Sequence, residues 1–162
     1  MRVLVTGDRG FIAKNLPKSF EKLGSEVIHA EDNDTDIRKK TELCVHRNSS
    51  DEWRSVIERT NVDIIIHNAA VVGTDVVALN VQEATLTNVM GTYNLSRACN
   101  DANIPICYLG TSVIYDAHNY QNEKITEQSK IRPNTYYGCL KLSGENIVRA
   151  ETNDWIIIRP LF

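Results

Sequence analysis

Short apolar runs that alternate with helical segments constrain the fold of this chain more than any other feature. Arg2–Thr6 and Val62–His67 contain the apolar runs Val3–Val5 and Ile64–Ile66, which are typical of strands buried on both faces of a parallel sheet. Repeated strand–helix–strand units of this kind predict a doubly wound α/β domain with helices on both faces of the sheet. The predicted strands are Arg2–Thr6, Glu26–Ala30, Val62–His67, Ile104–Gly110 and Trp155–Arg159, and the predicted helices are Phe11–Leu23, parts of Lys39–Arg59, Glu83–Asp101 and Tyr136–Glu151.

Length and composition are those of one globular domain spanning residues 1–162. The chain has 162 residues, of which 42% are hydrophobic and 24% charged, enough for a core of its own. A net charge of −3 argues against a nucleic-acid partner, and no apolar run approaches the roughly 20 residues of a membrane span. We therefore expect neither nucleic acid nor membrane as a partner.

The cysteines and the N-terminal residues indicate the cellular compartment of the protein. Cys44, Cys99, Cys107 and Cys139 are spaced too widely for a zinc site or a disulfide framework. The N-terminus passes directly from an apolar run to glycine and charge, unlike a secretory signal. We expect no metal, reduced thiols and a cytoplasmic protein.

A glycine turn joins the first strand to the first helix. Gly7 and Gly10 allow the backbone to approach a ligand closely, and the helix after the turn offers free N–H groups and a positive dipole end to phosphates. In open α/β sheets, ligands bind at the carboxyl ends of the strands. The turn therefore predicts a Rossmann-type dinucleotide site, with contacts from Gly7, Arg9, Gly10, Phe11 and Ile12. Pro17, within the predicted helix, removes a hydrogen bond and predicts a kink.

Further motifs come after the glycine turn in a fixed order along nearly all 162 residues. Together they resemble the extended short-chain dehydrogenase/reductases, the NAD-dependent epimerase/dehydratase family that modifies nucleotide sugars. The resemblance implies that Asn68, Ala69, Ala70 and Asn88 bind the cofactor. The full set is the segment of the glycine turn, Thr6–Ala13, followed by Asp63–Ala70, Asn88–Thr92, Leu109–Tyr115, Tyr137–Lys141 and Arg159–Pro160.

A tyrosine followed four residues later by a lysine occurs twice. Tyr120 and Lys124 lie in a polar loop, whereas Tyr137 and Lys141 begin a predicted helix, where positions four apart share a face. We assign the family's catalytic pair to Tyr137 and Lys141, which also contact the cofactor. A free phenol titrates near pH ~10, and a nearby ammonium lowers that pKa, so that Tyr137 takes the proton from a sugar hydroxyl while hydride leaves the same carbon.

The third catalytic position and the cofactor type are inferred from the same resemblance. Counting back from Tyr115, Thr111 falls at the family's catalytic Ser or Thr, and the alternative is a strand-end cap. Glu31 comes after the second strand, where an acid accepts bonds from the ribose hydroxyls of NAD. Arg9 instead suits the extra phosphate of NADP. We favour NAD and keep NADP open, with Asp36 and Ile37 resembling the segment that contacts adenine.

The two residues after Thr111 narrow the choice of reaction. Family dehydratases carry acids at these positions, where this chain has Ser112 and Val113. A 4-epimerase acting on a nucleotide sugar needs only Thr111, Tyr137, Lys141 and a bound cofactor, and it is the leading prediction. A 4-keto-sugar epimerase-reductase resembling GDP-fucose synthase is the alternative, and a catalytically silent NAD(P)-binding module is another.

Length and helix pairing complete the expectations from the resemblance. Extended members of the family continue with a substrate-binding lobe after the Arg-Pro segment, so we expect a chain truncated relative to the family and a sugar pocket that is half built. In the family, the helices that correspond to Glu83–Asp101 and Tyr136–Glu151 pair across a two-fold axis. We expect a homodimer.

Overall fold

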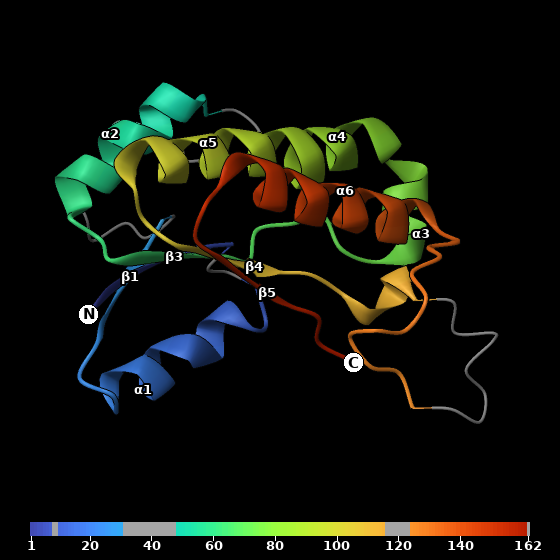
Figure 1. Cartoon of the computed structure of the whole chain (residues 1–162), viewed down its shortest axis with the longest axis horizontal. Helices are drawn as coiled ribbons and strands as arrows, with labels where there is room; N and C mark the ends of the chain where they lie inside the picture. Colours follow the sequence, from blue (N-terminus) through green and yellow to red (C-terminus); the bar gives the residue numbers. More distant parts are fainter. Residues whose placement is uncertain (8–9, 31–47, 116–123, 162) are drawn as a thin grey trace.

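A parallel sheet forms the centre of the molecule. The computed structural model describes residues 1–7, 10–30, 48–115 and 124–161, and within these ranges the sheet has five strands in the order β2-β1-β3-β4-β5 (Figure 1). The strand order reverses at β1, which pairs with β2 on one side and β3 on the other. The predicted α/β class is confirmed. The strands are β1 (Arg2–Thr6), β2 (Glu26–His29), β3 (Ile64–His67), β4 (Ile106–Leu109) and β5 (Trp155–Ile158).

Helices cover both faces of the sheet. In Figure 1, α1 (Leu16–Glu21) lies below the sheet, and α2 (Ser50–Thr60), α5 (Thr92–Ala102) and α6 (Tyr136–Glu151) lie above it. Successive residues of a strand point to opposite faces, so the central strands feed two apolar clusters. The larger lies under α2, α5 and α6 and contains Leu4, Trp53, Ile65, Leu95 and Ile106; the smaller lies against α1 and contains Val3, Val5, Ala13, Ile66 and Cys107.

The first helix differs from its prediction. It begins at Leu16 rather than Phe11, after a 3₁₀ turn at Ala13–Asn15 (η1), and Pro17 falls in its first turn. A first-turn residue has no intrahelical partner for its N–H, so proline costs nothing there and its fixed φ favours the helix. The predicted kink at Pro17 was therefore wrong.

The long helix before β4 is composite. It runs as α4 (Val81–Thr85), a π-helical segment η2 (Leu86–Gly91) and α5, and it ends at Asn103 in the left-handed conformation. The short helix α3 (Thr74–Leu79) that precedes it was not predicted, because six residues give too little periodicity. A 3₁₀ turn, η3 (Ser112–Ile114), lies after β4.

The edge strand β5 is exposed on the face that Ile156 and Ile158 share, whereas Ile157 packs against the larger cluster. Ile156 is 51% exposed and Ile158 47%, unlike the fully buried Val3, Leu4 and Val5 of β1. Among the described residues, no helix has both the length and the apolar character needed to cross a membrane.

Candidate functional site

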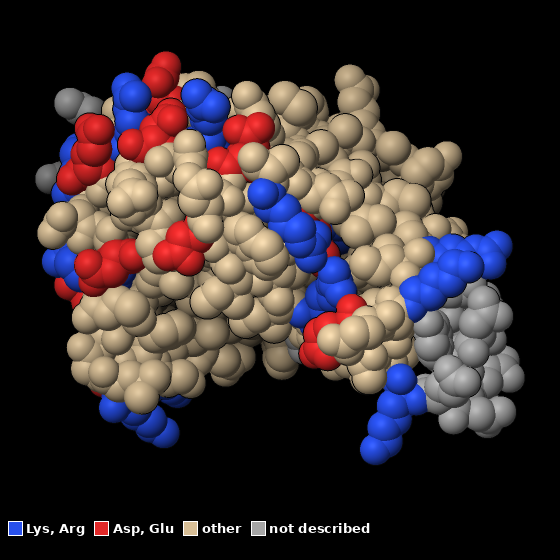
Figure 2. Space-filling view, in the orientation of Figure 1, with Lys and Arg blue, Asp and Glu red and all other residues tan. Residues whose placement is uncertain are grey.

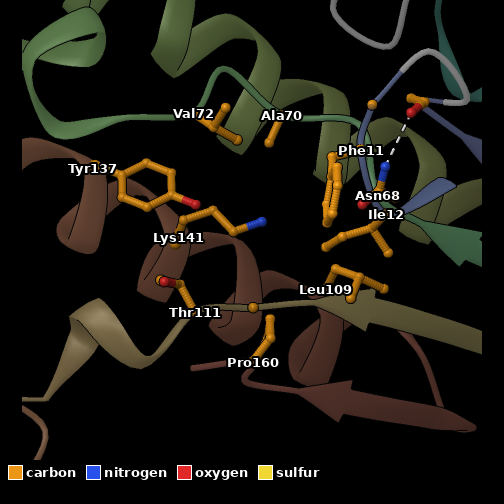
Figure 3. A pocket seen from close by; sticks show the side chains of 13 residues that line it. Phe11, Ile12, Asn68, Ala70, Val72, Leu109, Thr111, Tyr137, Lys141 and Pro160 are labelled. Atoms are coloured by element: carbon orange, nitrogen blue, oxygen red, sulfur yellow. Dashed lines mark hydrogen bonds between the residues drawn. The ribbon is translucent and has the colours of Figure 1, made fainter. Parts of the chain in front are cut away.

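A cavity of about 400 Å³ opens at the carboxyl ends of the strands, beside the point where the strand order reverses (Figure 3). This is where open α/β sheets bind ligands. The cavity is lined by Gly7, Gly10, Phe11, Ile12, Asn68, Ala70, Val72, Leu109, Gly110, Thr111, Tyr137, Lys141 and Pro160.

The glycine turn forms one wall, and its geometry requires glycine. Gly7 has a φ of +66°, and a Cβ there would lie 2.6 Å from the Cα of Ala69. The carbonyl oxygen of Gly7 accepts from the N–H of Gly10 at 3.0 Å and from the side-chain amide of Asn68 at 3.0 Å (Figure 3). The turn is thus held against the end of β3, with bare backbone at the cavity.

A buried hydrogen-bond chain ties the ends of β1 and β3 to the composite helix. The N–H of Ala69 donates to Thr6 Oγ1 at 3.1 Å, and Thr6 Oγ1 lies 2.9 Å from His67 Nδ1. The hydroxyl of Thr92 donates to the carbonyl of Asn88 at 2.9 Å, so it accepts from His67 Nε2, 3.0 Å away. This assigns the ring proton to Nε2, and burial lowers the pKa of His67 to about 3, so the ring is neutral.

Asn88 acts from behind the cavity wall. Its side chain is buried and bonds both backbone groups of Val71, accepting from the N–H at 2.8 Å and donating to the carbonyl at 2.9 Å. These bonds fix the segment that presents Ala70 and Val72 to the cavity. Asn88 and Ala69, expected from the family resemblance to bind the cofactor, are not among the lining residues. Asn88 instead supports the segment that lines the cavity, and Ala69 bonds to Thr6 behind it.

Three predicted catalytic side chains meet in the cavity. Helix α6 begins where Thr135 caps it, accepting from the N–H of Gly138 at 3.0 Å, and its first turns direct Tyr137 and Lys141 inward (Figure 3). Thr111 faces them from the end of β4. Its oxygen also accepts from the N–H of Val113 at 3.3 Å, so Thr111 lines the cavity and caps η3 at once.

The phenol and the amine respond oppositely to burial. Burial raises the pKa of Tyr137, and the nearby Thr111 hydroxyl offsets part of that rise. Lys141 is 3% exposed, and its Nζ lies 4.2 Å from the centroid of the Tyr108 ring. Burial lowers the pKa of Lys141 to about 7, although the carboxylate of Glu145 raises it. Near neutral pH the amine is thus divided between its charged and neutral forms, whereas an ammonium beside the phenol was expected from the sequence.

Some predicted residues lie outside the described ranges, and some lining residues were missed. These are four expected cofactor contacts, Arg9, Glu31, Asp36 and Ile37. The described structure therefore does not test whether the cofactor is NAD or NADP. Four residues that line the cavity were not predicted: Val72, Leu109, Gly110 and Pro160. The last three end a strand or lie just after one, and that position was the signal that could have identified them.

The family model described as RmlD substrate binding domain matches residues 1–160. Among curated relatives, dTDP-4-dehydrorhamnose reductase of Aggregatibacter actinomycetemcomitans is 29% identical over 98% of this chain and 50% of the relative. GDP-6-deoxy-D-talose 4-dehydrogenase of the same species is 32% identical over 91% of this chain and 47% of the relative. The chain therefore spans about half the length of the curated relatives it matches.

Solved structures share the fold. A dTDP-4-dehydrorhamnose reductase from Clostridium acetobutylicum superposes with a TM-score of 0.81 at 26% identity, covering 98% of this chain and 52% of the other. The UDP-glucose 4-epimerase of Thermus thermophilus, in complex with NAD, superposes with a TM-score of 0.80 at 19% identity, covering 98% of this chain and 54% of the other. At 19% identity the second likeness concerns the fold alone.

Proposed function

Because the chain belongs to the family described as RmlD substrate binding domain, within the nucleotide-sugar reductases and epimerases of the short-chain dehydrogenase/reductase type, we propose that its cavity binds NAD or NADP. We further propose hydride transfer at a keto carbon of a nucleotide sugar. The observation that carries the proposal is the meeting of Thr111, Tyr137 and Lys141 beside the glycine turn. The cradle suits a dinucleotide, since Gly7 and Gly10 line the cavity with bare backbone that can approach pyrophosphate, and Gly7 lies so close to Ala69 that no Cβ fits there.

The reductase direction is favoured over the 4-epimerase expected from the sequence. Two of the similar curated proteins are a 4-dehydrorhamnose reductase and a 6-deoxytalose 4-dehydrogenase, and both names describe oxidation or reduction at a sugar carbon. The bound cofactor would supply the hydride. Thr111 holds the keto oxygen, Tyr137 gives it a proton as the hydride arrives, and the Lys141 ammonium stabilises the phenolate left behind. The product is the alcohol, and solvent returns the proton to Tyr137.

Alanine substitutions at two glycines with the same backbone conformation test cofactor binding. Gly7 and Gly24 have φ values of +66° and +68°, so alanine strains the backbone at both. A Cβ at Gly7 meets Ala69, whereas a Cβ at Gly24 meets nothing within 4 Å. In fluorescence titrations with NADH and NADPH, we expect Gly7→Ala to weaken binding at least about tenfold and Gly24→Ala to leave it unchanged. A wild-type chain that binds neither cofactor contradicts the proposal.

Turnover separates a working reductase from a silent binding module. The chain covers 50% of the similar reductase, and a catalytically silent NAD(P)-binding module is the second candidate. Oxidation of NADPH or NADH with a dTDP-4-keto-6-deoxy sugar, abolished by Tyr137→Phe, supports the reductase. Binding that Tyr137→Phe leaves intact, with no turnover by the wild type, supports the module.

A homodimer completes the proposal. Figure 2 shows the surface around α3, α4 and the start of α6, at the upper right of the view, as largely free of charged side chains. Leu86, Met90 and Tyr136 expose large apolar groups on the composite helix and at the start of α6. Light scattering at micromolar concentration should give a dimer for the wild type and a monomer for Met90→Glu. A monomeric wild type contradicts the dimer.

A further inference from the structure

We infer that Glu145 is a positioning residue that favours the charged form of the Lys141 amine, and that Arg159, bound to the Glu145 carboxylate, limits this effect. The inference rests on the proposed function in one respect, the catalytic task of the Lys141 amine. The effect of Glu145 on the charge of that amine does not depend on it. The geometry that carries it lies behind the cavity, where a charged cluster joins α6 to the end of β5.

The carboxylate of Glu145 is fully buried and held by two guanidinium groups. Arg159 binds it through both carboxylate oxygens, with Nε 3.0 Å from Oε1 and Nη2 2.7 Å from Oε2. Arg149 adds a longer contact of 3.3 Å to Oε2. Glu145 lies one helical turn after Lys141, so the two side chains share the inner face of α6.

The carboxylate also lies directly behind the cavity wall. A Cβ on Gly110, which lines the cavity, would come 2.6 Å from Glu145 Oε1. Because Gly110 has no side chain, the carboxylate can lie this close to the site. Arg159 donates in addition to the hydroxyl of Tyr115 at 2.6 Å, which ties the cluster to the segment that begins at Thr111.

The other described groups around the Lys141 amine offer it no compensating negative charge. From β4 the ring of Tyr108 faces it, from β3 the neutral His67, and from its own helix the phenol of Tyr137. Burial lowers the pKa of Lys141, and of the described groups the one that raises it is the Glu145 carboxylate. A buried ion cluster adds little stability compared with apolar packing, so its electrostatic effect on the amine is the better reason for it.

The cluster therefore determines at which pH the amine can assist the phenol. A neutral amine cannot stabilise the Tyr137 phenolate. Without Glu145 the amine loses its proton at a lower pH, so the upper pH limit of activity falls. Because Arg159 partly cancels the carboxylate, removing Arg159 should strengthen the effect of Glu145 on Lys141. The two substitutions are thus expected to act in opposite directions.

The test is NMR titration of lysine Cε resonances in the cofactor-free chain, with Lys141→Met identifying the resonance. Glu145→Gln should lower the titration midpoint of Lys141 by roughly one pH unit, as expected for loss of a nearby opposite charge. Arg159→Gln should raise it. The matched control is Glu151→Gln, which removes a carboxylate from the same helix. Because the partner of Glu151 is Arg97, this variant should leave the Lys141 midpoint unchanged.

Opposite shifts separate an electrostatic role from a merely structural one. Equal or absent shifts in Glu145→Gln and Arg159→Gln, with circular dichroism like the wild type, overturn the inference. If Glu145→Gln does not fold, Arg159→Gln decides alone, and a midpoint that fails to rise overturns it. A wild type that binds no cofactor refutes the proposed function without changing these midpoints, so the two failures are distinguishable.

Discussion

Removing the Lys141 amine should stabilise the protein, and the gain should depend on pH. The amine titrates with a pKa of about 7 in the folded chain, against an ordinary value of 10.5. Between these values the unfolded chain binds the proton and the folded chain has lost it, so unfolding takes up a proton. The unfolding free energy contributed by this group therefore rises with pH across that window. Well below pH 7 both states are protonated, and the cost of burying the charge is present in full.

The magnitude comes from proton linkage. Each proton taken up on unfolding changes the unfolding free energy by about 1.4 kcal/mol per pH unit. With a pKa of about 7, the folded Lys141 has lost half of its proton at neutral pH and nearly all of it two pH units higher. Integrated over this interval, the wild type should become more stable by about 2 kcal/mol relative to Lys141→Met.

Urea unfolding at pH 7, 8 and 9 measures this difference directly. Lys141→Met should be more stable than the wild type at pH 7, and its advantage should shrink by about 2 kcal/mol by pH 9. Lys18→Met is the control, because Lys18 is exposed and its removal should give no such trend. An advantage of Lys141→Met that stays constant with pH would contradict a lowered pKa for Lys141 in the folded chain.

Three further substitutions probe the surroundings of the site. Gly110→Ala drives a Cβ into the buried Glu145 carboxylate and should cost about 1–3 kcal/mol in thermal or urea unfolding; a neutral result contradicts the close approach. Asn88→Ala removes both bonds to the backbone of Val71 and should weaken cofactor binding several-fold in a fluorescence titration, while unchanged affinity would mean that the wall needs no such support. Ile65→Ala, at a fully buried position of the larger cluster, should cost about 2–5 kcal/mol in urea unfolding and leave the cofactor affinity of the folded protein unchanged, and a cost below ~1 kcal/mol contradicts its place in the core.

Local signals in the sequence were sufficient for most of the fold. Helix α6 has the predicted bounds, Tyr136–Glu151, because Thr135 caps its start and its inner face is periodic. The strands agree to within a few residues, since short apolar runs fit a buried parallel sheet. The glycine turn and the Tyr137–Lys141 pair lie at the cavity for the same reason, as both depend on neighbours near in sequence.

The features that the sequence did not reveal depend on residues far apart in the chain. The contact of Glu145 with Arg159 and the approach of Gly110 to that carboxylate exist only once α6 lies on the sheet. The lowered pKa of Lys141 results from burial that no local pattern encodes. Pro17 was misread because its effect depends on where the helix begins, and helix boundaries are the least certain feature of a periodic pattern.

In the proposed complex, the glycine turn holds a dinucleotide and the nicotinamide lies beside Tyr137 and Lys141. A crystal structure of the chain soaked with NAD(H) or NADPH would show whether it does. We predict pyrophosphate density against the backbone of Gly10–Ile12 and a nicotinamide ring within reach of the Tyr137 hydroxyl. Density for the dinucleotide at any other surface, or a filled cavity with the side chains of Tyr137 and Lys141 turned out of it, would contradict this arrangement.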